Sequence, residues 1–255
     1  MTEDARILAV DWGATSVKSA LVDADGRALS PLKRRRTPHP CSPDTFFDVV
    51  RARVEATGAR RVGVGFPGEM REGLVVGTGN LAREGGPGTP LIPELVERWR
   101  GRDLSYELSE LTGADVRVIN DAALAALGCG GGYGVELIVT LGTGCGLALM
   151  DGGELQPTPD VGTHPSRDGR SFDVALGERA RSRDEARWRE DVRQALIQWR
   201  DAFGVERVYL AGGNGPRLQV RDETWPPGIV IVGNQAALRG AARLFGARTP
   251  SSGVG

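Results

Sequence analysis

The chain contains one short pattern twice, about 130 residues apart. The first copy, ILAVDWGATSVKSALVDADG at residues 7–26, is an apolar run, a turn of small residues, a second apolar run and an acidic glycine turn. The second copy, VELIVTLGTGCGLALMDGGEL at residues 135–155, has the same layout with different residues. Apolar runs of this length between glycine turns are typical of strands. The repeat predicts two related α/β halves that face a cleft.

The rest of the chain alternates helical and strand patterns, which favours an α/β fold. We expect helices at residues 42–59, 92–100, 105–113, 121–132, 185–204 and 234–246, and further strands within 28–38, 61–70, 115–120, 207–215 and 228–233. We predict an N-terminal domain at residues 1–119 and a C-terminal domain at residues 120–255. The terminal helix can pack back on the N-terminal domain, and the tail at 247–255 is predicted to be disordered.

Composition argues against several functional classes. The formal net charge is −1, so no overall field attracts nucleic acid or a membrane surface. The apolar segments are strand-length, which argues against a membrane-spanning helix, and the acidic N-terminus is unlike a signal peptide. The three cysteines form no CxxC pair, which argues against a disulfide framework and a structural zinc site. We predict a cytoplasmic protein.

The glycine turns have the composition of phosphate-binding loops. A phosphate requires backbone N–H groups at close range, and a side chain would obstruct that approach. LGTGCG, with Gly142, Thr143 and Gly144, and AGGNG at residues 211–215 both meet this requirement, although glycines also mark ordinary tight turns. Neither is a Walker A loop, because no Gly-Lys-Ser/Thr follows, and neither has the pattern of a dinucleotide-binding loop.

Charged residues accompany the first turn. Asp11 ends an apolar run beside Gly13. Its carboxylate can hold Mg²⁺, directly or through water, or can close the turn by a hydrogen bond to the backbone. Lys18 is interpreted as a surface charge or a neighbour of the phosphate. The run Lys33–Arg36 is interpreted as the solvated edge of a sheet, with a basic groove for a polyanion as the alternative.

Asn120 and Asp121 lie where a strand becomes a helix, in VRVINDAALAALG. This places them at the carboxyl edge of a sheet, where open α/β folds bind ligands. A carboxylate there can accept a proton from an attacking hydroxyl. The alternative role is a helix N-cap, for which one of the two side chains suffices.

Five motifs, in this order, resemble the ROK family of sugar kinases. They are DWGATSVK, VGVGFPGEMREGLVVGTGNLA, VRVINDAALAALG, LGTGCGLALMDGGEL and YLAGGNG. The likeness covers about residues 6 to 246, and it is strongest to the polyphosphate/ATP glucokinase-like branch. It implies the actin/hexokinase/Hsp70-type fold: two actin-like (ribonuclease H-like) halves with mixed sheets and flanking helices around a central cleft.

The resemblance also implies roles for the matched positions, with Asp121 as the catalytic base. The implied sugar-binding residues are Gly65, Pro67, Gly68, Asn80, Asn120, Asp121, Asp160, Thr163 and His164. The implied phosphate- or nucleotide-binding residues are Asp11, Gly13, Thr15, Lys18, Gly142, Thr143, Gly144, Gly212, Gly213 and Asn214. Asp11 is also the implied Mg²⁺ residue.

One segment departs from the family pattern. Where members carry Glu-x-Gly-His after the second phosphate motif, this chain has Asp160, Thr163 and then His164. An Asp carboxylate is one methylene shorter than Glu, and a Thr hydroxyl reaches less far than an imidazole. His164 either takes the missing role or is a loop histidine. Because sugar pockets discriminate through such hydrogen bonds, the acceptor can differ from glucose.

The expected function is that of a glucokinase-like kinase, which transfers a phosphoryl group from ATP or polyphosphate to a hexose hydroxyl with Mg²⁺. Two alternatives stay open: a ROK kinase for another hexose or an amino sugar, and a protein that binds sugar or nucleotide with little turnover. The resemblance implies no structural zinc and a homodimer. Neither nucleic acid nor a membrane is expected as a partner.

Overall fold

The computed structural model describes residues 6–158, 161–218, 225–233 and 235–246. One sheet contains β1 (Ile7–Trp12), β2 (Ser16–Val22), β3 (Lys33–Arg36), β4 (Arg61–Phe66) and β7 (Asp115–Asn120). The other contains β8 (Val135–Leu141), β9 (Cys145–Asp151), β10 (Glu154–Gln156), β11 (Arg207–Ala211) and β12 (Ile229–Gly233). A small hairpin, β5 (Met70–Arg71) and β6 (Leu74–Val75), and two short 3₁₀ helices, η2 (Val161–Thr163) and η3 (Gly215–Leu218), lie outside them.

The two sheets have the same topology. Their strand orders are β3-β2-β1-β4-β7 and β10-β9-β8-β11-β12. In each, the first three strands pair antiparallel, and the last two continue the sheet in parallel. The repeated sequence pattern forms the β1–β2 hairpin in one sheet and the β8–β9 hairpin in the other. The repeat therefore encodes two α/β halves of the same design.

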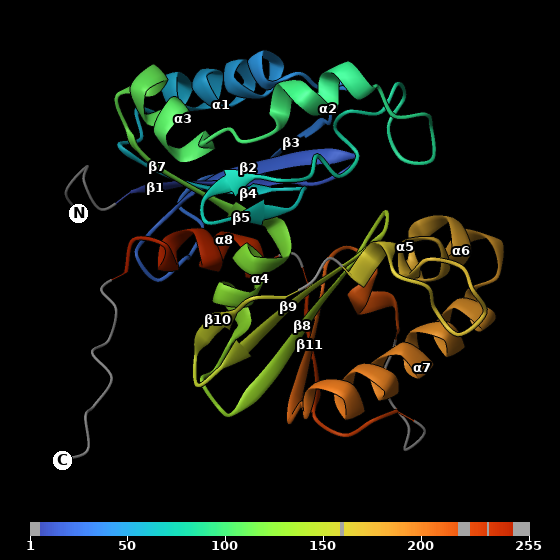
Figure 1. The fold of residues 1–255 in the computed structure, drawn as a ribbon. Helices are drawn as coiled ribbons and strands as arrows, with labels where there is room; N and C mark the ends of the chain where they lie inside the picture. The colour runs from blue at the N-terminus through green and yellow to red at the C-terminus, as the bar shows by residue number, and fades with distance from the viewer. Residues whose placement is uncertain (1–5, 159–160, 219–224, 234, 247–255) are drawn as a thin grey trace.

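Helices cover the outer face of each sheet (Figure 1). The first sheet is covered by α1 (Pro43–Thr57), α2 (Pro93–Trp99) and α3 (Leu104–Thr112), and the second by α5 (Phe172–Leu176), α6 (Glu178–Arg183) and α7 (Glu185–Phe203). Two further helices, α4 (Asp121–Cys129) and α8 (Gln235–Arg243), lie between the sheets. Among the helices of the described segments, none combines the length and the apolar character needed to cross a membrane.

The outer core of the first half is built around aromatic side chains. Phe46 of α1 lies 4.4 Å from Trp12 and 5.6 Å from Trp99 between ring centroids. The sequence signals for α1 are realised: the Ser42 hydroxyl accepts a hydrogen bond from Thr45 N (3.1 Å), and Gly58 ends the helix with a φ of 64°. This packing fixes β1, and with it the turn that follows at residues 13–15.

The pair α4 and α8 packs backbone against backbone. A Cβ added to Gly128 would lie 1.8 Å from Ala236 O, and one added to Gly240 would lie 1.8 Å from Leu124 O. On its other side α8 packs against the inner face of the first sheet, where a Cβ on Gly63 would lie 2.8 Å from the Ala241 Cβ. The expected terminal helix therefore forms and contacts the N-terminal half.

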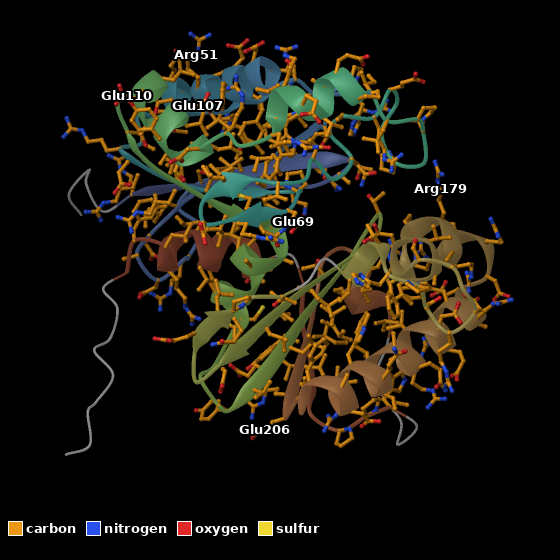
Figure 2. All side chains as sticks on the ribbon, in the orientation of Figure 1. Arg51, Glu69, Glu107, Glu110, Arg179 and Glu206 are labelled. Atoms are coloured by element: carbon orange, nitrogen blue, oxygen red, sulfur yellow. The ribbon has the colours of Figure 1, made fainter. Side chains whose placement is uncertain are left out.

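A hydrogen bond between α6 and the loop that contains Pro87 also connects the two halves. Arg179 of α6 reaches the loop of the other half (Figure 2), where its Nη2 donates to Pro87 O at 2.9 Å. The domain boundary at 119/120 falls where β7 becomes α4, and it stays a prediction. The expected disordered tail at 247–255 lies outside the described residues.

Candidate functional site

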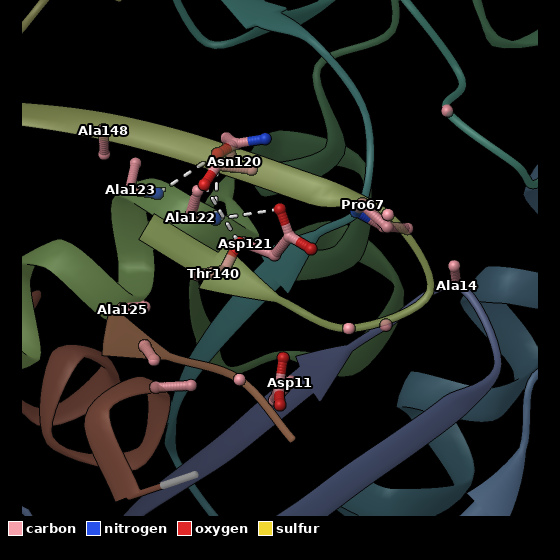
Figure 3. Close-up of a pocket in the computed structure, with 18 of the residues that line it drawn as sticks. Asp11, Ala14, Pro67, Asn120, Asp121, Ala122, Ala123, Ala125, Thr140 and Ala148 are labelled. Carbon is pink, nitrogen blue, oxygen red and sulfur yellow. Dashed lines mark hydrogen bonds between the residues drawn. The ribbon is translucent and has the colours of Figure 1, made fainter. Parts of the chain in front are cut away.

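A cleft of about 510 Å³ lies between the two halves, and residues from both of them line it (Figure 3). The predicted site residues that line it are Asp11, Gly13, Thr15, Lys18, Pro67, Gly68, Asn80, Asn120, Asp121, Gly142, Thr143, Gly144, Gly212 and Gly213. The structure thus brings together residues from five separate parts of the sequence. They come from the two hairpin turns, the segment after β4, the start of α4 and the turn after β11.

The β1–β2 turn presents two unused backbone N–H groups to the cleft. The N–H of Gly13 donates to Ser16 O at 3.0 Å and closes the turn. The N–H groups of Ala14 and Thr15 donate no hydrogen bond within the described parts of the chain, and both residues line the cleft. Adjacent free N–H groups of this kind form a binding site for an anion such as phosphate.

The β8–β9 turn repeats this arrangement. Gly142 N donates to Gly144 O at 3.0 Å, and the N–H groups of Thr143 and Gly144 have no acceptor among the residues described. The Thr143 hydroxyl donates to the Thr15 hydroxyl at 3.4 Å. The two turns therefore lie next to each other at the cleft.

Asp11 and Lys18 form an ion pair on the floor of the cleft. The two residues lie opposite each other on β1 and β2, and Lys18 Nζ lies 2.9 Å from Asp11 Oδ2 with both side chains under a fifth exposed. Asp11 Oδ1 has no hydrogen-bond partner in the described segments. Asp11 Oδ1 is therefore available to a metal cation, and the positive charge of Lys18 lies close to the first turn.

Asn120 and Asp121 have different roles at the start of α4 (Figure 3). Asn120 Oδ1 accepts hydrogen bonds from Ala122 N (2.9 Å) and Ala123 N (3.1 Å), and its Nδ2 donates to Gly68 O at 3.0 Å. Asn120 is therefore the N-cap. Asp121 Oδ1 accepts from Ala122 N at 2.8 Å, whereas Oδ2 has no partner among the described residues. Since Asn120 already caps the helix, the Asp121 carboxylate is available for a ligand.

The surroundings of Asp121 raise its pKa to about 7. Burial disfavours the charged carboxylate most, and the negative Asp11 adds to this effect, while hydrogen bonding from Ala122 N and the positive Lys18 act in the opposite direction. A carboxylate with a pKa near neutrality can exchange protons in both directions at physiological pH, which is what a general base requires.

Several predicted site residues lie outside the lining of the cleft. Gly65 lies beneath α4, where a Cβ would be 3.0 Å from Leu124 Cδ2. Asn214 is buried, and its Nδ2 donates to Gly142 O at 3.2 Å. Thr163 and His164 are exposed and do not line the cleft. Asp160 lies outside the described residues.

Sequence reasoning missed Asp173, which lies in the first turn of α5 and lines the cleft. Its Oδ1 accepts a hydrogen bond from Cys145 N at 2.8 Å. A Cβ on Gly144 would lie 2.3 Å from the same oxygen. Asp173 therefore supports the second turn from behind, and it explains why that position is glycine. No local motif marks this contact, because 28 residues separate the two partners.

Within the described residues, no group of three or more His, Cys, Asp or Glu side chains is placed to hold a metal ion. Mg²⁺ in phosphoryl-transfer sites takes one or two carboxylates together with substrate phosphates and water. Asp11, with its Oδ1 unpaired beside the two turns, matches that donor set.

Comparison with known proteins identifies relatives over almost the whole chain. The ROK family profile matches residues 7–165. The polyphosphate glucokinase of Mycobacterium tuberculosis is 26% identical over 259 residues, which are 95% of this chain and 89% of the relative. The polyphosphate glucokinase of Mycobacterium leprae is 25% identical over 260 residues, which are 95% of this chain and 74% of the relative.

Solved structures show the same fold. The inorganic polyphosphate/ATP-glucomannokinase of an Arthrobacter strain superposes with a TM-score of 0.72 at 27% identity, covering 93% of this chain and 97% of that one. A ROK family glucokinase of Streptomyces griseus, solved with glucose and AMPPNP, superposes with a TM-score of 0.70 at 20% identity, covering 94% and 98%. The actin-like fold and the enzyme class expected from the five motifs, a phosphotransferase of the hexose kinase type, are confirmed. The chain belongs to the ROK family.

Proposed function

We propose that this protein is a glucokinase-like sugar kinase that transfers the terminal phosphoryl group of ATP or polyphosphate to a hydroxyl of a hexose. One observation carries the proposal. The cleft that presents the free N–H groups of both hairpin turns also contains Asp121, whose pKa is about 7. The names of the relatives, polyphosphate glucokinase and polyphosphate/ATP-glucomannokinase, support these donors and this acceptor class.

In the proposed reaction Asp121 acts as the general base. Its unpaired Oδ2 accepts the proton of the sugar hydroxyl while the sugar oxygen attacks the terminal phosphorus of the donor. The bond from that phosphorus to the bridging oxygen breaks, and the leaving group is ADP or a polyphosphate shortened by one unit. The proton on Asp121 then passes to solvent, which a carboxyl group with a pKa near 7 permits at neutral pH.

The two turns hold the phosphates during this transfer. The N–H groups of Ala14 and Thr15 on one side, and of Thr143 and Gly144 on the other, stabilise the negative charge that spreads over the phosphoryl oxygens. Lys18 adds a positive charge at the same place. Asp11 would hold Mg²⁺, which neutralises charge on the donor phosphates when it is bound.

The sugar would occupy the side of the cleft formed by Pro67, Gly68 and Asn80. The amide of Asn120 already donates to Gly68 O. We therefore propose that Asn120 shapes this side of the cleft through Gly68, in addition to any direct contact with a sugar hydroxyl.

Phosphoryl transfer by the purified protein tests the proposal. The protein is incubated with glucose and Mg²⁺ and with either ATP or polyphosphate, and the sugar phosphate is measured by chromatography. Asp121→Ala should lower turnover by about 10²–10⁴-fold, the contribution of a general base. Asp103→Ala is a matched control, because Asp103 caps α3 outside the cleft. An equal loss in both variants would contradict the role of Asp121.

An acceptor other than glucose is the second candidate. The segment at residues 160–164 departs from the family pattern, and Thr163 and His164 do not line the cleft. Transfer to another hexose or to an amino sugar, with little to glucose, would favour this candidate. Sugar binding measured by calorimetry without transfer to any sugar would instead indicate a binding protein with little turnover. The cytoplasmic location and the homodimer stay predictions.

A further inference from the structure

Three consecutive carbonyl groups of the first turn are held by one short segment. Thr37 Oγ1 donates to Gly13 O at 2.7 Å, and Thr37 N donates to Thr15 O at 3.1 Å. Between them, His39 Nε2 lies 2.7 Å from Ala14 O. A carbonyl oxygen can only accept, so the His39 Nε2 carries the hydrogen.

We propose that Thr37 and His39 are positioning residues, which orient the N–H groups of the first turn toward the donor phosphates. A peptide group is planar and trans, so its C=O and N–H bonds point in opposite directions. Gly13 O shares a peptide plane with the N–H of Ala14, and Ala14 O shares one with the N–H of Thr15. Hydrogen bonds that hold these two oxygens therefore direct the two unused N–H groups away from the segment at 37–39.

The surroundings of His39 limit the movement of its ring. The Nδ1 atom is buried and has no hydrogen-bond partner among the described residues. A Cβ on Gly86 would lie 2.8 Å from the His39 Cδ2 atom, so the ring packs directly against the backbone of another loop. The packing of its Cδ2 edge against Gly86 and the hydrogen bond from Nε2 keep the ring beside the Ala14 carbonyl.

The second turn has a counterpart of this arrangement. Gly142 O accepts hydrogen bonds from Glu178 N at 2.9 Å and from Asn214 Nδ2 at 3.2 Å. This oxygen shares its peptide plane with the unused N–H of Thr143. In both turns, residues from distant segments hold the carbonyl oxygens and leave the N–H groups for the ligand. The alternative, that Thr37 and His39 serve only to stabilise the fold, does not account for this correspondence.

The proposal rests on the proposed phosphate-binding role of the cleft, and it is tested by binding as well as by turnover. Calorimetry measures the affinity for inorganic tripolyphosphate with Mg²⁺, and a steady-state assay gives KM for the donor and for the sugar. Thr37→Val removes the hydroxyl donor at nearly constant volume, and His39→Leu removes the ring donor. His39→Gln restores an N–H at a similar distance from the backbone. Thr57→Val is the matched control, because that hydroxyl bonds to helix carbonyls of α1.

We expect Thr37→Val and His39→Leu each to weaken tripolyphosphate binding and to raise KM for the donor by about three- to tenfold, the effect of one hydrogen bond. KM for the sugar should change less than twofold. His39→Gln should recover most of the affinity, and Thr57→Val should bind as the wild type does. Thermal unfolding of each variant separates these effects from a loss of folded protein.

Unchanged tripolyphosphate affinity in both Thr37→Val and His39→Leu would overturn the positioning role, whether or not the unfolding temperature falls. A wild-type protein that binds neither tripolyphosphate nor ATP would overturn it together with the proposed function. If the wild type binds ATP alone, KM for ATP in the variants decides the positioning role. A wild-type protein that binds tripolyphosphate but phosphorylates no sugar would refute the proposed function alone, and the affinities of the variants would still decide the positioning role.

Discussion

Two neighbouring polar residues at the start of α4 have separate roles that the sequence alone left open. Asn120 supplies the helix cap and the link to Gly68 O, whereas Asp121 keeps one carboxylate oxygen unpaired. Asp121 is also held in an environment that disfavours its charge. Such local instability is typical of catalytic groups, because the surroundings that tune a pKa also make the charged form costly.

This instability predicts the effect of Asp121→Asn on folding. The folded-state pKa of about 7 lies above that of an unfolded Asp, about 4. The stability that Asp121 contributes is therefore fully present below about pH 4 and is lost as the pH rises through 7. The variant should unfold at a higher temperature than the wild type at pH 8, and at a similar temperature at pH 4. Calorimetric unfolding at both pH values measures this, and a lower unfolding temperature at pH 8 would contradict the raised pKa.

The same pKa predicts how the turnover of the wild type depends on pH. A general base acts in its deprotonated form, so kcat/KM should rise about tenfold per pH unit below pH 7 and level off above it. Initial rates between pH 5 and 8 measure this dependence, with Asp103→Ala giving the same profile as the wild type. A profile that is flat across this range would argue against Asp121 as the base.

Glycines in the β8–β9 turn and in the turn after β11 should respond differently to alanine substitution. A Cβ on Gly142 or Gly213 would meet nothing within 4 Å, whereas one on Gly144 would lie 2.3 Å from Asp173 Oδ1. Gly144→Ala should therefore destabilise the fold by about 1–3 kcal/mol. Gly142→Ala and Gly213→Ala should leave stability unchanged but raise KM for the donor, since the space beside them belongs to the ligand. Urea unfolding and donor titrations separate these cases, and unchanged donor KM in both would place the phosphates elsewhere.

The edge strand β3 has basic side chains on both of its faces. Asp11, Lys18 and Arg34 lie opposite one another across β1, β2 and β3, and all three line the cleft. Arg36 is two positions further along β3 and shares the face of Arg34, while Lys33 and Arg35 share the other face. Lys33 and Arg35 therefore fit the interpretation as a solvated edge. For Arg34 and Arg36, on the face toward the cleft, the alternative of a basic groove for a polyanion is still to be tested.

Substitutions on the two faces of β3 test that groove. Arg34→Gln combined with Arg36→Gln should raise KM for polyphosphate about three- to tenfold, because each arginine can form a charge-assisted hydrogen bond to phosphate. The effect on ATP should be smaller, and it should shrink at high salt. Lys33→Gln combined with Arg35→Gln is the matched control on the opposite face. Equal changes in both double variants would indicate a general charge effect.

The elements were largely predictable from sequence, whereas the supports of the site were not. The repeated hairpins and the helix caps are local patterns, so ILAVDWG and LGTGCG indicated both turns and their contents. Asp173, His39 and Asn214 act through contacts with residues at least 25 positions away. The sequence of one protein does not show which residues far apart along the chain come into contact. The resemblance implies a phosphate- or nucleotide-binding role for Asn214, which stays a prediction, whereas its hydrogen bond to Gly142 O is visible only in the structure.

Helices α4 and α8 form a layer between the two sheets and pack against both of them. Side chains of α8 complete the inner core of the first sheet with Ile7 and Ala9, while Ala236 belongs to a core cluster on the side of the second sheet, with Ile138. Motion of one half against the other, which kinases use to exclude water, must therefore be accommodated around this helix pair.

The close approach of the two helices predicts a large effect for a small substitution. Gly240→Ala would place a Cβ 1.8 Å from Leu124 O, and the helices must then separate. We expect a loss of stability of about 1–3 kcal/mol or more. Gly246→Ala is the matched control, because its Cβ would meet Arg243 O at an ordinary 3.6 Å. Urea unfolding measures both, and equal stability of the two variants would contradict backbone-to-backbone packing.

The position of α8 has a consequence for synthesis on the ribosome. Strands β1 and β2 precede the second sheet in the chain, yet the helix that covers their inner face includes residues 237–242, which follow it. Domains commonly fold in the order in which they emerge from the ribosome. Here the nascent N-terminal half must keep apolar strand surface uncovered until α8 has been translated, so its inner core is completed only after the strands of the second sheet have been made.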